Sequence, residues 1–267
     1  MEKLLEKKYR QLKSILGNYH RPAIAYSGGV DSALLLAVTR QICPDVQAII
    51  ADGIMLPRSE FKEAKALTDD LDAALTVVPV NILENTDIRE NSARRCYFCK
   101  RFIFTQIKEV AKKLECDVIF DGTNTDDLKD YRPGIKALEE LSVVSPFVKA
   151  GMSKADIREL SRIFSLPTAE KPAMACLATR LPAGEWLSEE KLRKIEAGEE
   201  ILKQLGLNQY RLRLINNENG RIECYPAEFE KILKSREQLL DKFYDIGFRT
   251  VTLDLAGYKQ GKMNLPK

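Results

Sequence analysis

A short glycine-containing segment holds the first residues whose types and spacing could do chemistry. It reads Ser-Gly-Gly-Val-Asp-Ser and consists of Ser27, Gly28, Gly29, Val30, Asp31 and Ser32. Two adjacent glycines let the backbone curl so that its N–H groups converge, and the serine hydroxyls add further donors. At the start of a helix these N–H groups are unpaired and lie at the positive end of the helix dipole. We therefore predict an anion site here, and a phosphate group suits it best.

The residues after the glycines distinguish between two kinds of phosphate loop. A Walker loop has a lysine there to hold the β and γ phosphates, whereas this chain has Val30 and Asp31. The order Ser-Gly-Gly-x-Asp-Ser resembles the PP-loop of the N-type ATP pyrophosphatases. That resemblance implies ATP and Mg²⁺ as cofactors and cleavage of ATP between its α and β phosphates. A glycine turn capped by Asp31 is the alternative interpretation of the same residues.

A cysteine and an arginine lie four residues apart in the least periodic part of the chain. They are Cys176 and Arg180, in the sequence Lys-Pro-Ala-Met-Ala-Cys-Leu-Ala-Thr-Arg. A thiol on an irregular segment beside a cation can be deprotonated and nucleophilic. Its apolar neighbours equally suit a small buried side chain, so the residues alone leave both interpretations open.

A Cys-x-x-Cys pair, Cys96 and Cys99, enters a predicted helix among basic residues. Two thiols at this spacing can share a metal ion, form a redox disulfide or pack at a helix start. The sequence has no second Cys-x-x-Cys, which weakens the case for a structural zinc site. If Cys176 approached the pair, the three thiolates could bind a [4Fe–4S] cluster with one open iron.

Two arginines, Arg211 and Arg213, alternate with apolar residues in a predicted strand. Their side chains should share one face about 7 Å apart, a spacing that suits a phosphate or paired carboxylates. An ordinary solvated strand face would give the same pattern.

Elsewhere in the chain, Asp126 and Asp127 could hold Mg²⁺ or cap the helix that follows.

Apolar strands alternate with helices through the first part of the chain and would position these residues. We expect strands at 22–26, 46–51, 75–80 and 117–120, and helices at 33–38, 58–71, 99–114 and 153–164. This alternation predicts an α/β fold with a parallel sheet whose ligands bind at the carboxyl ends of the strands. The loops after three strands should therefore line one nucleotide pocket, formed by the glycine segment, Asp52, Gly122, Asn124 and Asp127.

The chain changes character near its prolines at 167 and 172, where we place a domain boundary. We expect an α/β PP-loop domain at residues 1–170 and a small α+β domain at 171–267. In the second domain, Ser188 should cap a long helix that ends before Gly206. A hairpin with its turn at Asn219-Gly220, a helix at 229–243 and a strand at 250–255 predict a partly antiparallel sheet.

Composition restricts location and partners. The 267 residues include 42 Lys and Arg against 39 Asp and Glu, which gives no reason to expect nucleic acid as a partner. We expect a cytoplasmic protein without a membrane segment, whose six cysteines are reduced. Cys43, Cys116 and Cys224 should pack, and His20, which precedes the first strand, is a poor candidate for a base.

Several motifs occur in one order over nearly the whole chain. After the glycine segment come Asp121-Gly-Thr-Asn-Thr-Asp-Asp127, Tyr131-Arg-Pro-Gly134, Pro172-Ala-Met-Ala-Cys-Leu-Ala-Thr-Arg180, Arg211-Leu-Arg213, Arg221-Ile-Glu223 and Gly257-Tyr-Lys259. Together they resemble the LarE family of ATP-dependent sacrificial sulfur transferases. This resemblance is far more specific than that of the PP-loop alone.

The resemblance implies that ATP adenylates a carboxylate of a pyridinium-3,5-dicarboxylate mononucleotide and that the Cys176 thiolate attacks the acyl adenylate. Cleavage of the cysteine Cβ–S bond then leaves a thiocarboxylate on the product, a precursor of the nickel-pincer cofactor, and dehydroalanine in the protein. It also implies that Arg180, Arg211 and Arg213 bind this small-molecule substrate, and that the chain forms a homo-oligomer, a hexamer.

Other functions use part of the same residues. A [4Fe–4S] cluster on Cys96, Cys99 and Cys176 would make sulfur transfer to the same substrate catalytic rather than sacrificial. An amidating PP-loop ligase would need an ammonia source, and the chain has no glutaminase segment. A tRNA-thiolating enzyme should carry a basic surface, which the near-neutral charge disfavours. A nucleotide-binding regulator would release no pyrophosphate.

Overall fold

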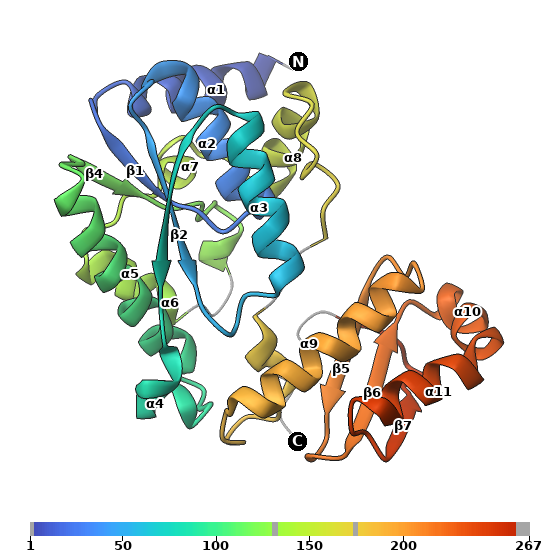
Figure 1. Cartoon of the computed structure of the whole chain (residues 1–267). Helices are drawn as coiled ribbons and strands as arrows, with labels where there is room; N and C mark the ends of the chain where they lie inside the picture. Colours follow the sequence, from blue (N-terminus) through green and yellow to red (C-terminus); the bar gives the residue numbers. More distant parts are fainter. Residues whose placement is uncertain (1–2, 130–132, 173–175, 260–267) are drawn as a thin grey trace. The chain divides into compact units, whose positions relative to one another are not determined.

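A computed structural model describes residues 3–129, 133–172 and 176–259 (Figure 1). The chain forms two compact units, the first made of Met1–Ile82 and Arg94–Ala173, the second of Leu83–Ala93 and Met174–Lys267. This division lies close to the expected boundary between residues 170 and 171. No sequence pattern had indicated that Leu83–Ala93 belongs with the second half of the chain.

The first unit contains a four-stranded parallel sheet in the order β3-β2-β1-β4. Its strands are β1 (Pro22–Ala25), β2 (Gln47–Asp52), β3 (Ala74–Pro79) and β4 (Val118–Phe120). Phe120 also forms a parallel bridge with Val144 at the β4 edge. The expected α/β fold with a parallel sheet is therefore confirmed. The strand order changes direction between β1 and β4, so a crevice can form between the carboxyl ends of these two strands.

Helices cover both faces of this sheet (Figure 1). They are α1 (Lys3–Leu16), α2 (Val30–Ile42), α3 (Arg58–Asp70), α5 (Arg95–Lys113), α6 (Gly134–Glu140), α7 (Pro146–Lys149) and α8 (Lys154–Ile163), with a 3₁₀ turn η2 (Asp127–Lys129). Helices α1, α2, α3, α7 and α8 share one apolar core, whereas α5 packs against β1, β2 and β3. Helix α8 begins with a capping box, as its N-cap serine had indicated.

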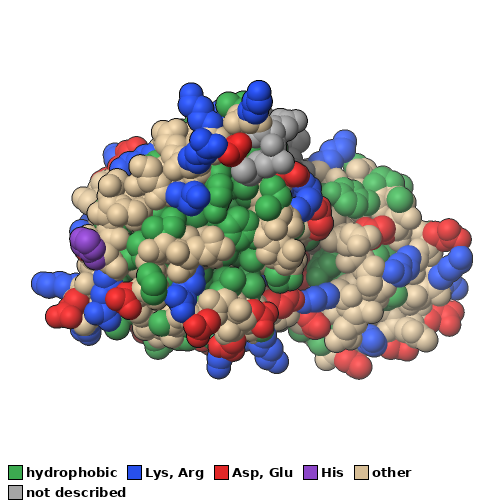
Figure 2. Space-filling view, turned by 90° about the horizontal axis from the view of Figure 1, so that it is seen from above, with side chains coloured by type: hydrophobic (Ala, Val, Ile, Leu, Met, Phe, Trp, Pro, Cys, Tyr) green, Lys and Arg blue, Asp and Glu red, His purple; other side chains and the backbone are tan. Residues whose placement is uncertain are grey.

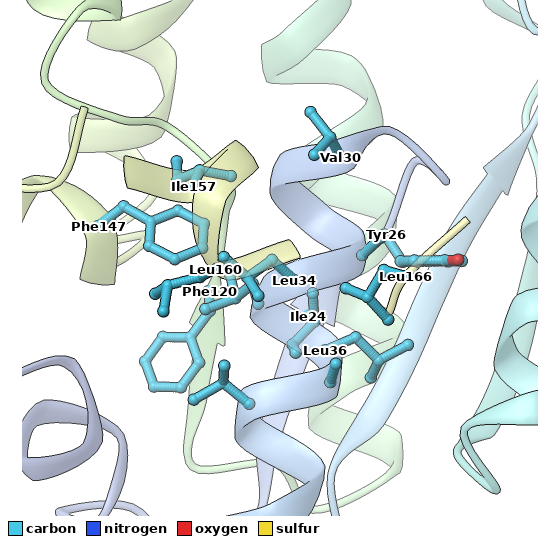
Figure 3. Packing of buried hydrophobic residues seen from close by; sticks show 14 of the residues in the cluster. Ile24, Tyr26, Val30, Leu34, Leu36, Phe120, Phe147, Ile157, Leu160 and Leu166 are labelled. Carbon is cyan, nitrogen blue, oxygen red and sulfur yellow. The ribbon is translucent and has the colours of Figure 1, made fainter. Parts of the chain in front are cut away.

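The core of the first unit fixes the start of α2. Ile24 of β1 and Leu34 of α2 are fully buried and lie beside Phe147 of α7 and Leu160 of α8 (Figure 3). Burial of a side chain of this size stabilises the fold by roughly 1.5–3 kcal/mol. Because α2 is apolar on several sides, it is held between the sheet and its neighbouring helices, and the loop that precedes it has a rigid support.

The second unit contains a three-stranded sheet in the order β5-β6-β7. Strand β5 (Tyr210–Leu214) is antiparallel to β6 (Asn219–Cys224), and β7 (Thr250–Leu253) is parallel to β6. Its helices are α4 (Thr86–Arg89), α9 (Glu189–Gln204), α10 (Phe229–Lys234) and α11 (Arg236–Asp245), and its 3₁₀ turns are η1 (Ile82–Glu84, at the junction), η3 (Leu177–Arg180) and η4 (Pro226–Glu228). The expected α+β architecture with a partly antiparallel sheet is confirmed.

Two local predictions in this unit were wrong. Asn219 and Gly220 lie within β6, and the turn precedes them, because Asn216 Oδ1 accepts from the main-chain N atoms of Glu218 and Asn219 at 3.0 and 2.9 Å. Such Asx turns compete with hairpin turns that contain Asn-Gly. The helix expected at 229–243 is divided at Ser235, which is the last cap of α10 and the first cap of α11.

The segment Leu83–Ala93 is tied to the second unit by main-chain contacts. Leu187 N donates to Arg89 O at 2.8 Å, and Gly184 N donates to Asn91 O at 3.0 Å. The guanidinium of Arg89 also stacks on the Trp186 ring, 5.2 Å from its centroid. Because these contacts join residues about a hundred positions apart, periodicity within a short window carries no trace of them.

Candidate functional site

The glycine segment forms a closed loop directly before α2. Ser32 Oγ accepts from Ser27 N at 3.2 Å, lies 3.1 Å from Ser27 Oγ and donates to Gly29 O at 3.2 Å. Gly29, which has no side chain, is the N-cap residue of α2, and the carboxylate of Asp31 in the first turn bonds to Asn124 Nδ2 and Lys154 Nζ. The N-cap residue therefore supplies no side-chain acceptor to the first N–H groups of α2, which suits an anion site.

Gly28 could not be replaced without moving its surroundings. Its φ angle is +71°, a conformation that residues with a side chain rarely adopt. A Cβ atom on Gly28 would lie 2.5 Å from the Cβ atom of Ala64 in α3. The loop thus packs directly against α3, and both this contact and the positive φ angle favour glycine at position 28.

The loop after β4 contacts the glycine loop, as the alternation of strands and helices had predicted. A Cβ atom on Gly122 would lie 2.9 Å from Asp31 Cβ and 3.2 Å from Ser32 N, so the two backbones approach closely. Asn124 Nδ2 donates to Asp31 Oδ1 at 3.3 Å. Asp127 Oδ2 accepts from Asn124 N at 3.0 Å and shapes this second loop. The pairing lies at the point where the strand order changes direction.

Asp52 lies at the carboxyl end of β2, the strand beside β1. Its Oδ1 atom forms an ion pair with Arg58 Nη1 of α3 at 2.6 Å. Asp52 therefore lies at the expected edge of the sheet, where it forms an ion pair with a basic residue of α3.

A residue that sequence reasoning missed, Lys154, contacts the glycine loop from α8. Its Nζ atom lies 2.5 Å from Asp31 Oδ2, and its main-chain N donates to Asp126 Oδ2 at 2.9 Å. Hydrogen bonds from Lys129 and from the Lys154 main chain lower the pKa of Asp126. The serine before Lys154 had indicated a helix start, but nothing local to it indicates which loop that helix start faces.

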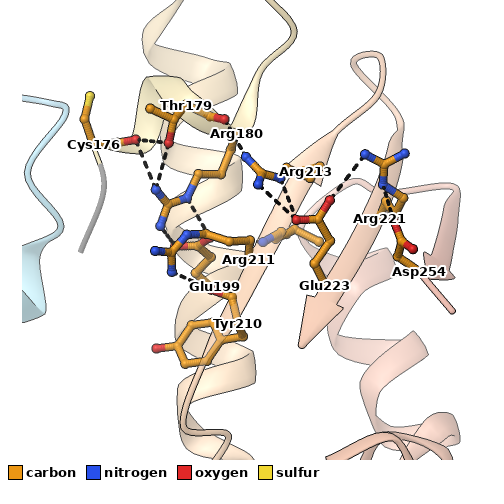
Figure 4. Close-up of polar contacts among 11 residues, drawn as sticks. Cys176, Thr179, Arg180, Glu199, Tyr210, Arg211, Arg213, Arg221, Glu223 and Asp254 are labelled. Atoms are coloured by element: carbon orange, nitrogen blue, oxygen red, sulfur yellow. Dashed lines mark hydrogen bonds and ion pairs between the residues drawn. The ribbon is translucent and has the colours of Figure 1, made fainter. Parts of the chain in front are cut away.

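In the second unit, the main-chain carbonyl of Cys176 is held by three donors (Figure 4). Thr179 N, Thr179 Oγ1 and Arg180 Nη1 donate to this oxygen at 3.0, 2.7 and 3.1 Å. Cys176 is a partly exposed residue, and Figure 4 shows its sulfur directed away from the Arg180 guanidinium. The 3₁₀ turn η3 thus fixes the backbone at Cys176, a residue that is partly exposed.

Arg180, expected in a substrate-binding role, is fully buried. Its Nε and Nη2 atoms donate to Glu199 Oε1 and Oε2 at 2.8 and 2.9 Å. Glu199 Oε1 also accepts from Leu212 N of β5 at 3.0 Å. The structure therefore places Arg180 as a link between Cys176, helix α9 and strand β5.

Arg211 and Arg213 are also buried, so the alternative of a solvated strand face is wrong. Arg213 Nε and Nη2 both donate to Glu223 Oε2, at 3.0 and 2.9 Å, and its Nη1 donates to Thr179 O at 2.6 Å. Arg211 Nη1 donates to Tyr210 O at 2.7 Å. Burial lowers the pKa of Arg211, and the positive charge of Arg180 lowers it further. A bound anion would therefore stabilise the charged form of the Arg211 guanidinium.

Comparison with known proteins decides the family. No family model matches the chain. An uncharacterized protein of Synechocystis sp. is 38% identical over 264 residues, 98% of each chain, and an uncharacterized protein of Methanocaldococcus jannaschii is 32% identical over 236 residues, 88% of this chain and 90% of that one. The pyridinium-3,5-bisthiocarboxylic acid mononucleotide synthase of Lactiplantibacillus plantarum is 29% identical over 262 residues, 97% of this chain and 95% of the synthase. The chain belongs to the LarE family.

The other cysteines of this LarE-family chain fall into two groups. Burial raises the pKa of Cys43, of Cys116 and of Cys224, the last to about 11, so these thiols are neutral near pH 7. Cys96 is exposed and Cys99 partly exposed in the first turns of α5. Both lie in the first unit and Cys176 lies in the second. An iron–sulfur cluster bound by all three therefore stays a prediction.

Two of the motifs extend beyond the residues that the structure describes. Tyr131 and Arg132, like residues 173–175 beside Cys176, lie outside the described residues. His20 is exposed, and its main-chain N donates to Asp117 Oδ2 at 2.7 Å (Figure 2). Basic and acidic side chains are interspersed over the face in Figure 2. Among the described helices, none combines the length and apolar character that crossing a membrane needs.

Proposed function

We propose that this chain is an ATP-dependent sulfur transferase that converts a carboxylate of a pyridinium-3,5-dicarboxylate mononucleotide into a thiocarboxylate, a step in nickel-pincer cofactor synthesis. The observation that carries this proposal is the similarity to the Lactiplantibacillus plantarum synthase over 97% of this chain. That similarity spans the glycine loop of the first unit and the Cys176 region of the second.

The first unit would bind ATP and Mg²⁺. The N–H groups of the glycine loop and the hydroxyls of Ser27 and Ser32 would bind phosphate oxygens. The carboxylate of Asp31 and that of Asp127 are oxygen ligands of the kind that Mg²⁺ prefers. When bound, Mg²⁺ would neutralise charge on the pyrophosphate leaving group as the substrate carboxylate attacks the α phosphorus.

The second unit would supply the sulfur from Cys176. Its thiolate attacks the carbonyl carbon of the acyl adenylate, AMP leaves with the bonding electron pair, and a thioester forms. Loss of the Cys176 Cα proton then forms the Cα=Cβ double bond and breaks the Cβ–S bond. The thiocarboxylate leaves on the product, and dehydroalanine stays in the chain. Because Cys43, Cys116 and Cys224 have raised pKa values, they are poorer nucleophiles near neutral pH.

One buried arginine, Arg211, would provide positive charge for the substrate. Arg211 carries a pKa lowered by burial and by its neighbour Arg180, and an anionic carboxylate or phosphate would stabilise its charged form. Arg213, whose charge is balanced by Glu223, would support the turn that holds Cys176 through its bond to Thr179 O. We therefore propose that Arg211, rather than Arg213 or Arg180, contacts the substrate directly.

The proposal is tested with purified protein, ATP, Mg²⁺ and the dicarboxylate mononucleotide. Wild-type protein should release pyrophosphate and form the thiocarboxylate. Cys176→Ala should still release pyrophosphate but form no thiocarboxylate, while the matched control Cys116→Ala should do both. Wild-type levels of thiocarboxylate from Cys176→Ala would refute the role of Cys176, and absence of pyrophosphate release from the wild type would refute the proposed activity.

A further inference from the structure

Gly257 and Tyr258, a motif to which the proposed mechanism gives no role, lie in the turn after β7. Gly257 has a φ angle of +69°, and a Cβ atom on it would lie 2.9 Å from Cys224 O. Tyr258 N donates to the same oxygen at 2.8 Å. The glycine therefore lets the chain pass close to the carboxyl end of β6, where this hydrogen bond fixes the backbone of the tyrosine.

The Tyr258 ring contacts the guanidinium group of Arg211. Cys224 of β6 lies opposite Tyr210 of β5, so the turn after β7 returns the chain to the start of β5. Arg211 Cζ lies over the Tyr258 ring, 5.2 Å from its centroid, which is within the range of a cation–π interaction. The Tyr225 ring packs edge-on against the Tyr258 ring, with centroids 6.1 Å apart and an interplanar angle of 80°. The ring beside Arg211 is thus held by a main-chain bond and by a second ring.

These contacts orient the Arg211 guanidinium without neutralising it. Arg211 is buried, and its Nη1 atom donates to Tyr210 O at 2.7 Å (Figure 4). The ring of Tyr258 and the carbonyl of Tyr210 are both uncharged partners. Arg180 and Arg213 differ, because each of them pairs with a buried glutamate. A ring attracts a cation through its quadrupole and leaves the charge in place, so a guanidinium stacked on it can still bind an anion.

We propose that Tyr258 is a positioning residue for the substrate, whose ring holds the Arg211 guanidinium in the orientation that binds an anionic group of the mononucleotide. This inference rests on the proposed function and on the proposed contact of Arg211 with the substrate. Tyr258 acts through Arg211 and takes no part in the chemistry of sulfur transfer. Because the glycine loop lies in the first unit and Tyr258 in the second, the ring should affect binding of the mononucleotide and not binding of Mg²⁺–ATP.

The test measures two quantities for each variant: the dissociation constant of the dicarboxylate mononucleotide by calorimetry, and the single-turnover rate of thiocarboxylate formation at saturating substrate. Tyr258→Leu should raise the dissociation constant about fivefold to thirtyfold, as expected for loss of a desolvated cation–π contact. The saturating rate should change by less than about threefold, since the interaction is made equally in the ground state and the transition state. Tyr258→Phe keeps the ring and should bind like the wild type. Tyr244→Leu, at an exposed tyrosine of α11, is the matched control and should change neither quantity.

A variant that preserves the shape of the ring separates its electrostatic role from simple packing. Incorporation of pentafluorophenylalanine at position 258 withdraws electrons from the face of the ring and so removes its attraction for a cation. This variant should bind the mononucleotide about as weakly as Tyr258→Leu and bind Mg²⁺–ATP like the wild type.

The outcomes distinguish this inference from the proposed function. Equal affinity of the pentafluorophenylalanine and Tyr258→Phe proteins for the mononucleotide would overturn the inference, as would a loss of affinity in Tyr258→Phe as large as that in Tyr258→Leu. If the wild type binds the mononucleotide and forms thiocarboxylate while Tyr258→Leu matches it, only this inference fails. If the wild type binds no mononucleotide, the proposed function fails and the inference with it.

Discussion

Arg180 and Glu199 form a bidentate ion pair inside the second unit, with Nε–Oε1 and Nη2–Oε2 distances of 2.8 and 2.9 Å. The same guanidinium donates to the main-chain carbonyl of Cys176 at 3.1 Å. Because the pair is buried and Glu199 also accepts from Leu212 N, the position of Cys176 is coupled to α9 and β5. A buried polar network therefore holds the main chain of Cys176, the proposed sulfur donor.

Arg180→Lys should slow sulfur transfer while leaving pyrophosphate release near the wild-type level. Lysine keeps the charge but lacks the fork that reaches Glu199 and the Cys176 carbonyl together. We expect thiocarboxylate formation to fall about tenfold or more, since misplaced reacting groups lose rate steeply. Arg193→Lys, at an exposed arginine of α9, is the control in the same two assays. An unchanged rate of thiocarboxylate formation would contradict a positioning role for Arg180.

Glu199→Gln should destabilise the protein by about 3–5 kcal/mol, because it removes the carboxylate that forms a bidentate ion pair with the buried Arg180 guanidinium. Urea unfolding of the variant and the wild type measures this difference in free energy. Glu189→Gln, at the exposed first turn of the same helix, should change the free energy of unfolding by less than about 1 kcal/mol. Equal effects of the two substitutions would show that burial of the pair does not matter.

Gly28→Ala should weaken ATP binding and lower stability, because its methyl group would meet Ala64 at 2.5 Å. Gly151→Ala is a matched control, since Gly151 has a similar φ of +66° with nothing within 4 Å of the added Cβ atom. The control should cost only the backbone strain, of about 1–2 kcal/mol. Adding Ala64→Gly to Gly28→Ala should recover part of the ATP affinity. If Gly28→Ala behaves like Gly151→Ala, the close contact with α3 is not important.

The free energy of unfolding should fall as the pH rises from about 9 to about 11, partly because of Cys224. Its pKa is raised from 9.0 to about 11 by burial, and then by Glu228, so the unfolded chain releases this proton at lower pH than the folded chain. Stability falls wherever the unfolded state binds fewer protons. Denaturant titrations should give a shallower fall for Cys224→Ala than for the wild type. Identical slopes would contradict the raised pKa.

Local patterns predicted the parts of the molecule that local chemistry determines. The parallel strands, the glycine loop before α2 and the capped start of α8 follow from hydrophobic periodicity, glycine geometry and capping residues within a few positions. The meeting of Gly122 with Asp31 also followed, because strands of a parallel sheet end on one edge.

Contacts between distant segments could not be predicted in the same way. The pairing of Lys154 with Asp31 joins residues 123 positions apart, and the sequence around each contains no mark of the other. The burial of Arg180 depends on Glu199, which the sequence does not distinguish from the other glutamates of helix α9. The turn before β6 depends on Asn216. The sequence predicted the turn three residues later, because Asn219-Gly220 is the stronger hairpin signal.

The intact mass of the protein after one round of turnover decides the role of Cys176. After reaction with ATP, Mg²⁺ and the dicarboxylate mononucleotide, the chain should be lighter by about 34 Da, the mass of H₂S, and peptide mapping should place dehydroalanine at residue 176. The thiocarboxylate formed should not exceed one equivalent per chain. Product formed beyond one equivalent with an unchanged protein mass would contradict sacrifice of Cys176, and iron bound through Cys96 and Cys99 would then identify the cluster mechanism.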